Sequence, residues 1–160
     1  MNENEFAAKI QELRGRLYRT AYMYLGSEAA ALDAVDEAVY RGLISYKKLR
    51  EPQYFSTWMM RILINVCKSE LKHRKRVLSV EELPETAVET FDSFPLRDAV
   101  LRLPEELKQP LILRYFSGLT TAETAAALLI PQGTAATRLR RALQLLKLEL
   151  SDEEVCNEQK

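Results

Sequence analysis

Residues 120–142 read TTAETAAALLIPQGTAATRLRRA, and this stretch restricts the possible folds of the chain more than any other. Thr120 followed by Glu123 matches a capping box, in which each side chain bonds the other residue's backbone N–H at a helix start. A short helix from Thr121 to about Leu128 is therefore predicted, then a turn, then a basic last helix opening at Gly133. Two short helices around a tight turn, the second one basic, are typical of a helix-turn-helix.

The composition of the whole chain agrees with helices. The chain has 160 residues, of which 47% are hydrophobic and 29% are charged, so it can bury the core of one ordinary domain or two small ones. This composition is far from the low hydrophobicity and high net charge of disordered chains. Five glycines and six prolines are too few to divide the chain into many short strands. We expect an all-α protein.

Three further helices are predicted before the middle of the chain. The first ends at Gly26, and Ser27 then caps the second. The third runs from about Tyr54 to Arg76 and is apolar on much of its circumference, so it should be the central helix of a small bundle. The apolar positions of the first two helices are Leu13, Leu17, Ala21 and Leu25, then Leu32, Val35, Val39 and Leu43.

Basic and acidic residues are equal in number, 23 of each, but they are segregated along the chain. Residues 61–76 hold six basic side chains against the single acid Glu70, and residues 81–98 hold six acids against Arg97. Helical periodicity fades in the acidic stretch, which also contains two prolines. We therefore predict two small helical domains joined by a flexible acidic linker. The expected divisions are a bundle at 1–76, the linker at 77–97, a helix-turn-helix domain at 98–150 and a polar tail at 151–160.

One face of the third predicted helix is basic. Its members recur at intervals of four, three and four residues and are Arg61, Asn65, Lys68 and Lys72. The cations would neutralise phosphates, and the Asn65 amide would hydrogen-bond the edge of a base. A solvated basic helix face has the same pattern, so spacing alone leaves both interpretations open.

The last predicted helix carries a second polar face opposite its leucines. Its members are Thr134, Thr137, Arg138 and Arg141. In the second helix of a helix-turn-helix such side chains reach base edges in the major groove, with Arg suited to guanine. The alternative is a helical hairpin with an exposed basic face.

The second predicted helix carries an acidic cluster instead. Asp33, Asp36 and Glu37 lie at i, i+3 and i+4, and such a cluster repels DNA. It would dock a basic protein surface, bind a divalent cation, or simply be solvated. Metal binding is disfavoured because no other carboxylates stand at a recognisable ligand spacing.

The sequence gives little support for a catalytic, metal-binding or cofactor-binding site. The chain has one histidine, His73, and two distant cysteines, Cys67 and Cys156, so we expect no hydrolytic triad, zinc site, disulfide framework or cofactor. Cys67 falls on an apolar stripe and is expected to be a buried small hydrophobe. The start of the chain has no signal-peptide pattern and no apolar run is long enough to span a membrane, so we expect a soluble, cytoplasmic protein that does not insert into membranes.

Taken in order, these pieces resemble the extracytoplasmic-function (ECF) group of sigma-70-type bacterial transcription initiation factors. The resemblance spans almost the whole chain. The segments similar to region two are Leu17–Tyr22, Ala31–Glu37 and Phe55–Asn65. The segments similar to region four are Leu103–Glu105, Leu113–Phe116, Gly118–Thr120, Pro131–Thr134 and Thr137–Ala142.

The resemblance implies a role for each charged face. Asp33, Asp36 and Glu37 align with the helix that grips the clamp of core RNA polymerase. The Arg61 to Lys72 face aligns with the part that melts the minus-ten element, with Asn65 lining the pocket of a flipped base. The polar face of the last helix aligns with the reader of the minus-thirty-five element.

The resemblance also implies partners and a mode of control. A factor of this kind has no catalytic activity of its own, acts as a monomer with core polymerase and promoter DNA, and is held inactive by an anti-sigma factor that is often membrane-anchored. The acidic linker would lie near the RNA exit path of the polymerase.

Two residues depart from the family pattern. Ala136 stands where Lys or Arg is usual, which leaves more of the DNA contact to the two arginines of the last helix. Leu129 stands at the helix-turn-helix corner, where a positive φ would cost a leucine about 1 kcal/mol. Two other functions remain open: a helix-turn-helix regulator that never engages polymerase, and a sigma-like decoy that binds a regulatory protein and no DNA.

Overall fold

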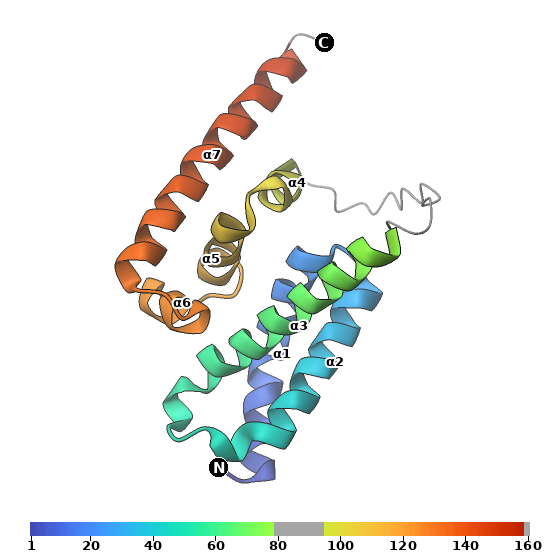
Figure 1. The fold of residues 1–160 in the computed structure, drawn as a ribbon, viewed down its shortest axis with the longest axis vertical. Coiled ribbons are helices and arrows are strands. Elements are labelled where there is room, and N and C mark those ends of the chain that lie inside the picture. Colours follow the sequence, from blue (N-terminus) through green and yellow to red (C-terminus); the bar gives the residue numbers. More distant parts are fainter. Residues whose placement is uncertain (79–94, 159–160) are drawn as a thin grey trace.

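The computed structural model describes the backbone of residues 1–78 and 95–158 and the side chains of residues 1–77 and 96–148. All the regular elements in this part of the chain are helical, which confirms the all-α class (Figure 1). The helices are α1 (Glu3–Leu25), α2 (Glu28–Ser45), α3 (Phe55–Leu78), α4 (Pro95–Arg102), α5 (Glu105–Tyr115), α6 (Thr121–Leu128) and α7 (Gln132–Glu158). Short 3-10 turns at Tyr46–Lys48 and Pro52–Tyr54 connect α2 to α3.

Two of the predicted segments, the linker and the polar tail, overlap helices of the structure. Most of the predicted linker, 77–97, lies outside the described residues, and α3 and α4 reach into its two ends. The helix α7 runs from Gln132 to Glu158 and so includes residues 151–158 of the predicted polar tail.

The helix ends follow from local chemistry. Gly26 caps α1 with φ 69°, a left-handed conformation that glycine adopts without steric cost, and Ser27 then accepts from the Ala30 N–H at the start of α2. A capping box that the sequence analysis did not identify begins α1. There the Glu5 N–H donates to Asn2 Oδ1 at 2.8 Å and the Asn2 N–H donates to Glu5 Oε2 at 3.0 Å.

The first bundle consists of α1, α2 and α3. The side chains of Leu17, Met59 and Leu63 have no exposed surface and form its centre. Gly42 brings α2 close to α3, because a Cβ atom at this position would lie 2.7 Å from Met59 Sδ. The helix α3 contacts α1 and α2 within the bundle and, across the molecule, α6.

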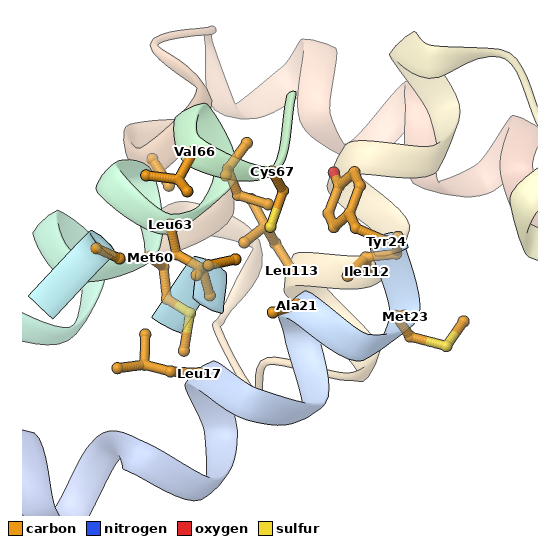
Figure 2. Close-up of a cluster of buried hydrophobic side chains, with 14 of the residues drawn as sticks. Leu17, Ala21, Met23, Tyr24, Met60, Leu63, Val66, Cys67, Ile112 and Leu113 are labelled. Carbon is orange, nitrogen blue, oxygen red and sulfur yellow. The ribbon is translucent and has the colours of Figure 1, made fainter. Parts of the chain in front are cut away.

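The second bundle consists of α4, α5, α6 and α7, and it packs directly against the first (Figure 1). Figure 2 shows Leu63 and Cys67 of α3 in one cluster with Ile112 and Leu113 of α5. Tyr24 of α1 belongs to the same cluster. The two domains predicted from the sequence therefore share one continuous hydrophobic core, which the sequence patterns did not indicate.

Candidate nucleic-acid interface

The basic face of α3 is divided by the second bundle. Asn65 and Lys72 are exposed, whereas Arg61 and Lys68 are half-buried. Arg61 points its guanidinium at the end of α6, where Nη2 donates to the Ala126 carbonyl at 2.8 Å and Nε donates to the Ala127 carbonyl at 3.3 Å. The four residues share a helix face, as the spacing predicts, but only part of this face is open to a ligand.

Lys68 faces an acid of the second bundle. Partial burial of Glu105 opposes its ionisation, but hydrogen bonds from Gln109 and Lys108 and the positive charges of Lys108 and Lys68 outweigh this, so the pKa of Glu105 is lowered. Lys108 Nζ lies 3.0 Å from Glu105 Oε2. The α5 carboxylate is therefore held ionised opposite a cation of α3.

Hydrogen bonds also connect the two bundles. The hydroxyls of Thr20 in α1 and Ser117 after α5 are fully buried and lie 2.5 Å apart. Arg16 Nε donates to the Ser117 carbonyl at 2.7 Å. Thr57 Oγ1 donates to Glu123 Oε2 at 3.4 Å. The interface is thus hydrogen-bonded as well as apolar.

The helix-turn-helix has the predicted local chemistry. Thr120 and Glu123 form the capping box, with both hydrogen bonds at 3.1 Å, and α6 spans the predicted residues. Leu129 adopts φ 57° and ψ 42° at the corner, which confirms the strained position, and its side chain is 75% exposed.

The predicted reading face lies on the first turns of α7. Thr137 and Arg141 are exposed, and Thr134 and Arg138 are half-buried. The Thr137 hydroxyl donates to the Gly133 carbonyl at 3.0 Å, a bond within the helix. Leu139, Ala142 and Leu146 are buried on the opposite side, as the apolar stripe predicted.

The acidic cluster of α2 divides into two parts. Asp33 and Glu37 line an open groove of about 650 Å³ between α2 and α3, together with Arg41, Glu70 and His73. The Arg41 Nε donates to Glu37 Oε1 at 2.7 Å.

Asp36 is exposed but does not line this groove. Its neighbours one turn away on α2 are the exposed apolar side chains of Leu32 and Tyr40. Sequence reasoning did not place Glu70 and His73 in the same groove as Asp33 and Glu37, because the packing of α2 against α3 brings them together and no spacing within one helix indicates it.

The structure gives Cys67 the predicted environment. The side chain is buried, and burial raises the pKa of its thiol to about 12. Within the described ranges no cluster of three or more His, Cys, Asp or Glu side chains is arranged to hold a metal ion. In the same part of the chain, no helix combines the length and the hydropathy that crossing a bilayer requires.

Two family descriptions match this chain in succession. Sigma-70 region 2 matches residues 10–77, which cover most of the first bundle, and Sigma-70, region 4 matches residues 93–146, which cover the second bundle.

Whole-chain relatives agree. RNA polymerase sigma factor SigV of Bacillus subtilis (strain 168) is 29% identical over 151 residues, which cover 91% of each chain. ECF RNA polymerase sigma factor SigW of the same organism is 25% identical over 171 residues, which cover 94% of this chain and 91% of its own. The sigma factor RpoE of Bartonella quintana, solved in complex with the anti-sigma factor NepR, has the same fold, with a TM-score of 0.77, 19% identity and coverage of 92% of this chain and 97% of its own.

Region 2 matches the first bundle, region 4 matches the second, and the sigma-factor relatives align with 91% and 94% of the chain. The protein therefore belongs to the ECF group of the sigma-70 family of transcription initiation factors.

Proposed function

We propose that three faces of this sigma factor each perform a different part of transcription initiation. The acidic face of α2, formed by Asp33, Asp36 and Glu37, binds core RNA polymerase. The basic face of α3, formed by Arg61, Asn65, Lys68 and Lys72, binds and melts the minus-ten element. The outer face of α7, formed by Thr134, Thr137, Arg138 and Arg141, reads the minus-thirty-five element.

One observation carries the proposal. The acidic face lies on α2, the two basic faces lie on α3 and α7, and surfaces of opposite charge thus stand on separate helices. An acidic surface repels DNA, so α2 suits a protein partner with basic side chains. Cations on α3 and α7 suit phosphates, and the exposed Asn65 amide suits a base edge. Separate sites on separate helices allow one chain to bind polymerase and promoter together.

Control by an anti-sigma factor is part of the proposal. The Bartonella quintana relative was solved with such a partner, and it has the same two-bundle fold. We expect a protein of this class to bind the present chain and to keep it from polymerase.

The test is a pull-down of the full chain with bacterial core RNA polymerase, followed by run-off transcription from a library of promoter fragments. We expect stable binding and transcripts that depend on the added chain, and the transcribed fragments reveal the promoter motif. Binding to duplex DNA without polymerase would favour a regulator, and binding to a regulatory protein alone would favour a decoy.

A further inference from the structure

We propose that a small pocket between α1 and the start of α3 binds one nucleotide, with the base in the pocket and the phosphate on its basic rim. The nucleotide is either one unit of the melted promoter strand or a free molecule, and two experiments distinguish these sources. The inference rests on the proposed function for the first source only. None of the three binding faces proposed above includes a residue of this pocket.

Two segments that are far apart in the sequence form the pocket. Residues 9–16 of α1 line one wall, and the turn at Pro52–Tyr54 with the first residues of α3 lines the other, at the end of the first bundle where the chain begins (Figure 1). The volume of about 180 Å³ is the space of about six water molecules. It suits one planar ring system and is smaller than the pockets of about 300 Å³ or more that hold larger ligands.

The floor of the pocket is apolar and is held in place by its neighbours. Leu13 and Phe55 line it, and both are buried. The Phe55 ring packs edge-on against Phe6, with ring centroids 5.6 Å apart, and it packs against Trp58 at 5.9 Å. A floor that is already ordered binds a flat ring without the cost of ordering its own side chains. The aromatic face of a base suits this floor.

The rim of the pocket is polar and carries more positive than negative charge. Lys9 and Arg16 lie two turns apart on one face of α1, both are half-buried, and the acid Glu12 lies between them. Lys9 Nζ lies 5.7 Å from the centroid of the Phe55 ring, and Arg16 Nε is fixed by its bond to the Ser117 carbonyl. Cations beside an apolar slot suit a nucleotide, because its phosphate is charged and its base is not.

The opposite wall provides groups that can bond the edge of a base. The Ser56 hydroxyl is half-buried, and a hydroxyl both donates and accepts. Gln53 Nε2 donates to Glu51 Oε2 at 2.6 Å, which holds the Gln53 amide in one orientation. A few fixed polar groups around a mostly apolar pocket are what orients a small ligand.

The pocket lies within reach of the base that we place at Asn65. Ser56 and Asn65 are nine residues apart in α3, which corresponds to a rise of about 13.5 Å. Consecutive bases of one duplex strand are about 3.4 Å apart, and a melted strand is more extended. A base of the same strand, no more than about four positions from the base at Asn65, would therefore fill the pocket.

An abasic scan of the non-template strand tests the promoter source with the full chain and core polymerase. Each duplex carries the promoter selected in the transcription experiment, with one base of the non-template strand removed, and its affinity is measured by competition. We expect two positions at which loss of the base weakens binding about tenfold. One is the position of the base at Asn65, and the second lies no more than about four positions away.

A pocket-filling variant assigns the second position. Ser56→Phe places a ring in the pocket, so loss of the second base should cost this variant nothing further, whereas loss of the first should still cost about tenfold. Asn65→Ala should show the reverse. A general folding defect would lower all affinities together and leave both differences in place. If Ser56→Phe stays sensitive at the second position, the pocket does not hold a promoter base.

The rim is tested by removing one charge. Lys9→Met keeps an unbranched side chain beside Phe55, so promoter binding should weaken about threefold and the slope of log affinity against log salt should fall by about one. Arg14→Met is the control, at an exposed position of the same helix outside the pocket, and should change neither quantity. Equal effects of the two variants would overturn the phosphate-binding role of the rim.

Trp58 provides the test for a free nucleotide. It is the single tryptophan of the chain, and its ring packs against Phe55. The full chain is titrated with nucleoside monophosphates while the emission of Trp58 is recorded. A saturable change that is absent in Ser56→Phe would identify a free nucleotide as a ligand of the pocket.

The outcomes separate this inference from the function on which it rests. If only the position at Asn65 is sensitive and the Trp58 emission does not change, the melting role of α3 stands and the nucleotide pocket is overturned. If no position is sensitive, the proposed role of Asn65 is wrong. The Trp58 titration then decides the pocket alone, because a saturable signal supports it and a flat one overturns it.

Discussion

The adjacent helices α2 and α3 differ in charge and in what covers them. The acidic residues of α2 are exposed to solvent, whereas two of the four residues on the basic face of α3 are half-buried beneath the second bundle. A spacing pattern indicates which side chains share a face, but it does not indicate whether another part of the chain covers that face. The surface that we propose to bind polymerase is thus open in this conformation, and the surface that we propose to bind the minus-ten element is partly covered.

The largest expected effect is on the open face. Asp36→Lys with Glu37→Lys should weaken core polymerase binding by about a hundredfold or more, because both acids would then repel a basic partner. The matched control is Glu3→Lys with Glu12→Lys, which makes the same change of charge at exposed positions of α1. Affinity is measured by titration of labelled polymerase, and equal affinity of the two variants would remove α2 from the interface.

The reading face of α7 should respond next. Arg141→Ala should weaken binding to the upstream element by about 1–3 kcal/mol if Arg141 contacts guanine. Binding is compared on the selected promoter and on scrambled duplexes at several salt concentrations. A uniform loss on all sequences, with a shallower salt dependence, would identify a phosphate contact instead.

A substitution in the exposed part of α3 should affect promoter melting more than polymerase binding. Asn65→Ala should lower open-complex formation about tenfold, because a base-edge hydrogen bond is lost, while binding to core polymerase stays unchanged. Permanganate reactivity of the melted strand reports the open complex. Ser69→Ala, at another exposed position of α3, is the control. Equal losses of melting and of polymerase binding would argue against a base-binding role.

A smaller effect concerns Leu129, at the corner that follows α6. Leu129→Gly should stabilise the protein by about 0.5–1 kcal/mol, because glycine adopts the left-handed conformation without strain, and the exposed leucine loses little packing. Ala126→Gly, within α6, should instead destabilise by about 1 kcal/mol. Denaturant unfolding distinguishes them, and equal destabilisation by both would show that the strain at Leu129 is negligible.

The smallest expected effect is the pH dependence of the Glu105 contact. The pKa of Glu105 is lowered in the folded protein, so its ionised form adds stability at pH values above its ordinary pKa of 4.5. That contribution should disappear as the pH falls below this value through the lowered pKa. Unfolding midpoints measured between pH 6 and pH 3 should therefore fall more for the natural chain than for Glu105→Gln, and parallel curves would contradict this assignment.

Which features of the structure could be predicted depends on what a sequence pattern contains. The helix stop at Gly26, the capping box at Thr120 and the strain at Leu129 are set by residues within a few positions of each other, and all three were predicted. The box formed by Asn2 and Glu5 has the same local signal and was overlooked. Its spacing was available in the sequence.

Contacts between segments that are far apart in the sequence could not be predicted from sequence patterns. Thr20 and Ser117 are separated by 97 positions, and neither belongs to a pattern that marks it as an interface residue. The groove that joins Asp33 to Glu70 likewise depends on how α2 and α3 pack. The partial cover of Arg61 is of this kind, and it changed the interpretation of a face that spacing had identified.

Glu123 takes part in a local contact and a distant contact at the same time. One carboxylate oxygen caps α6 through the Thr120 N–H, and the other accepts from Thr57 on α3. A lineage that replaced Glu123 would change both the start of α6 and the contact between the bundles in a single substitution. The side chains of α7 that we propose to read the promoter take no part in these two bonds, so a change of promoter preference there leaves both contacts of Glu123 in place.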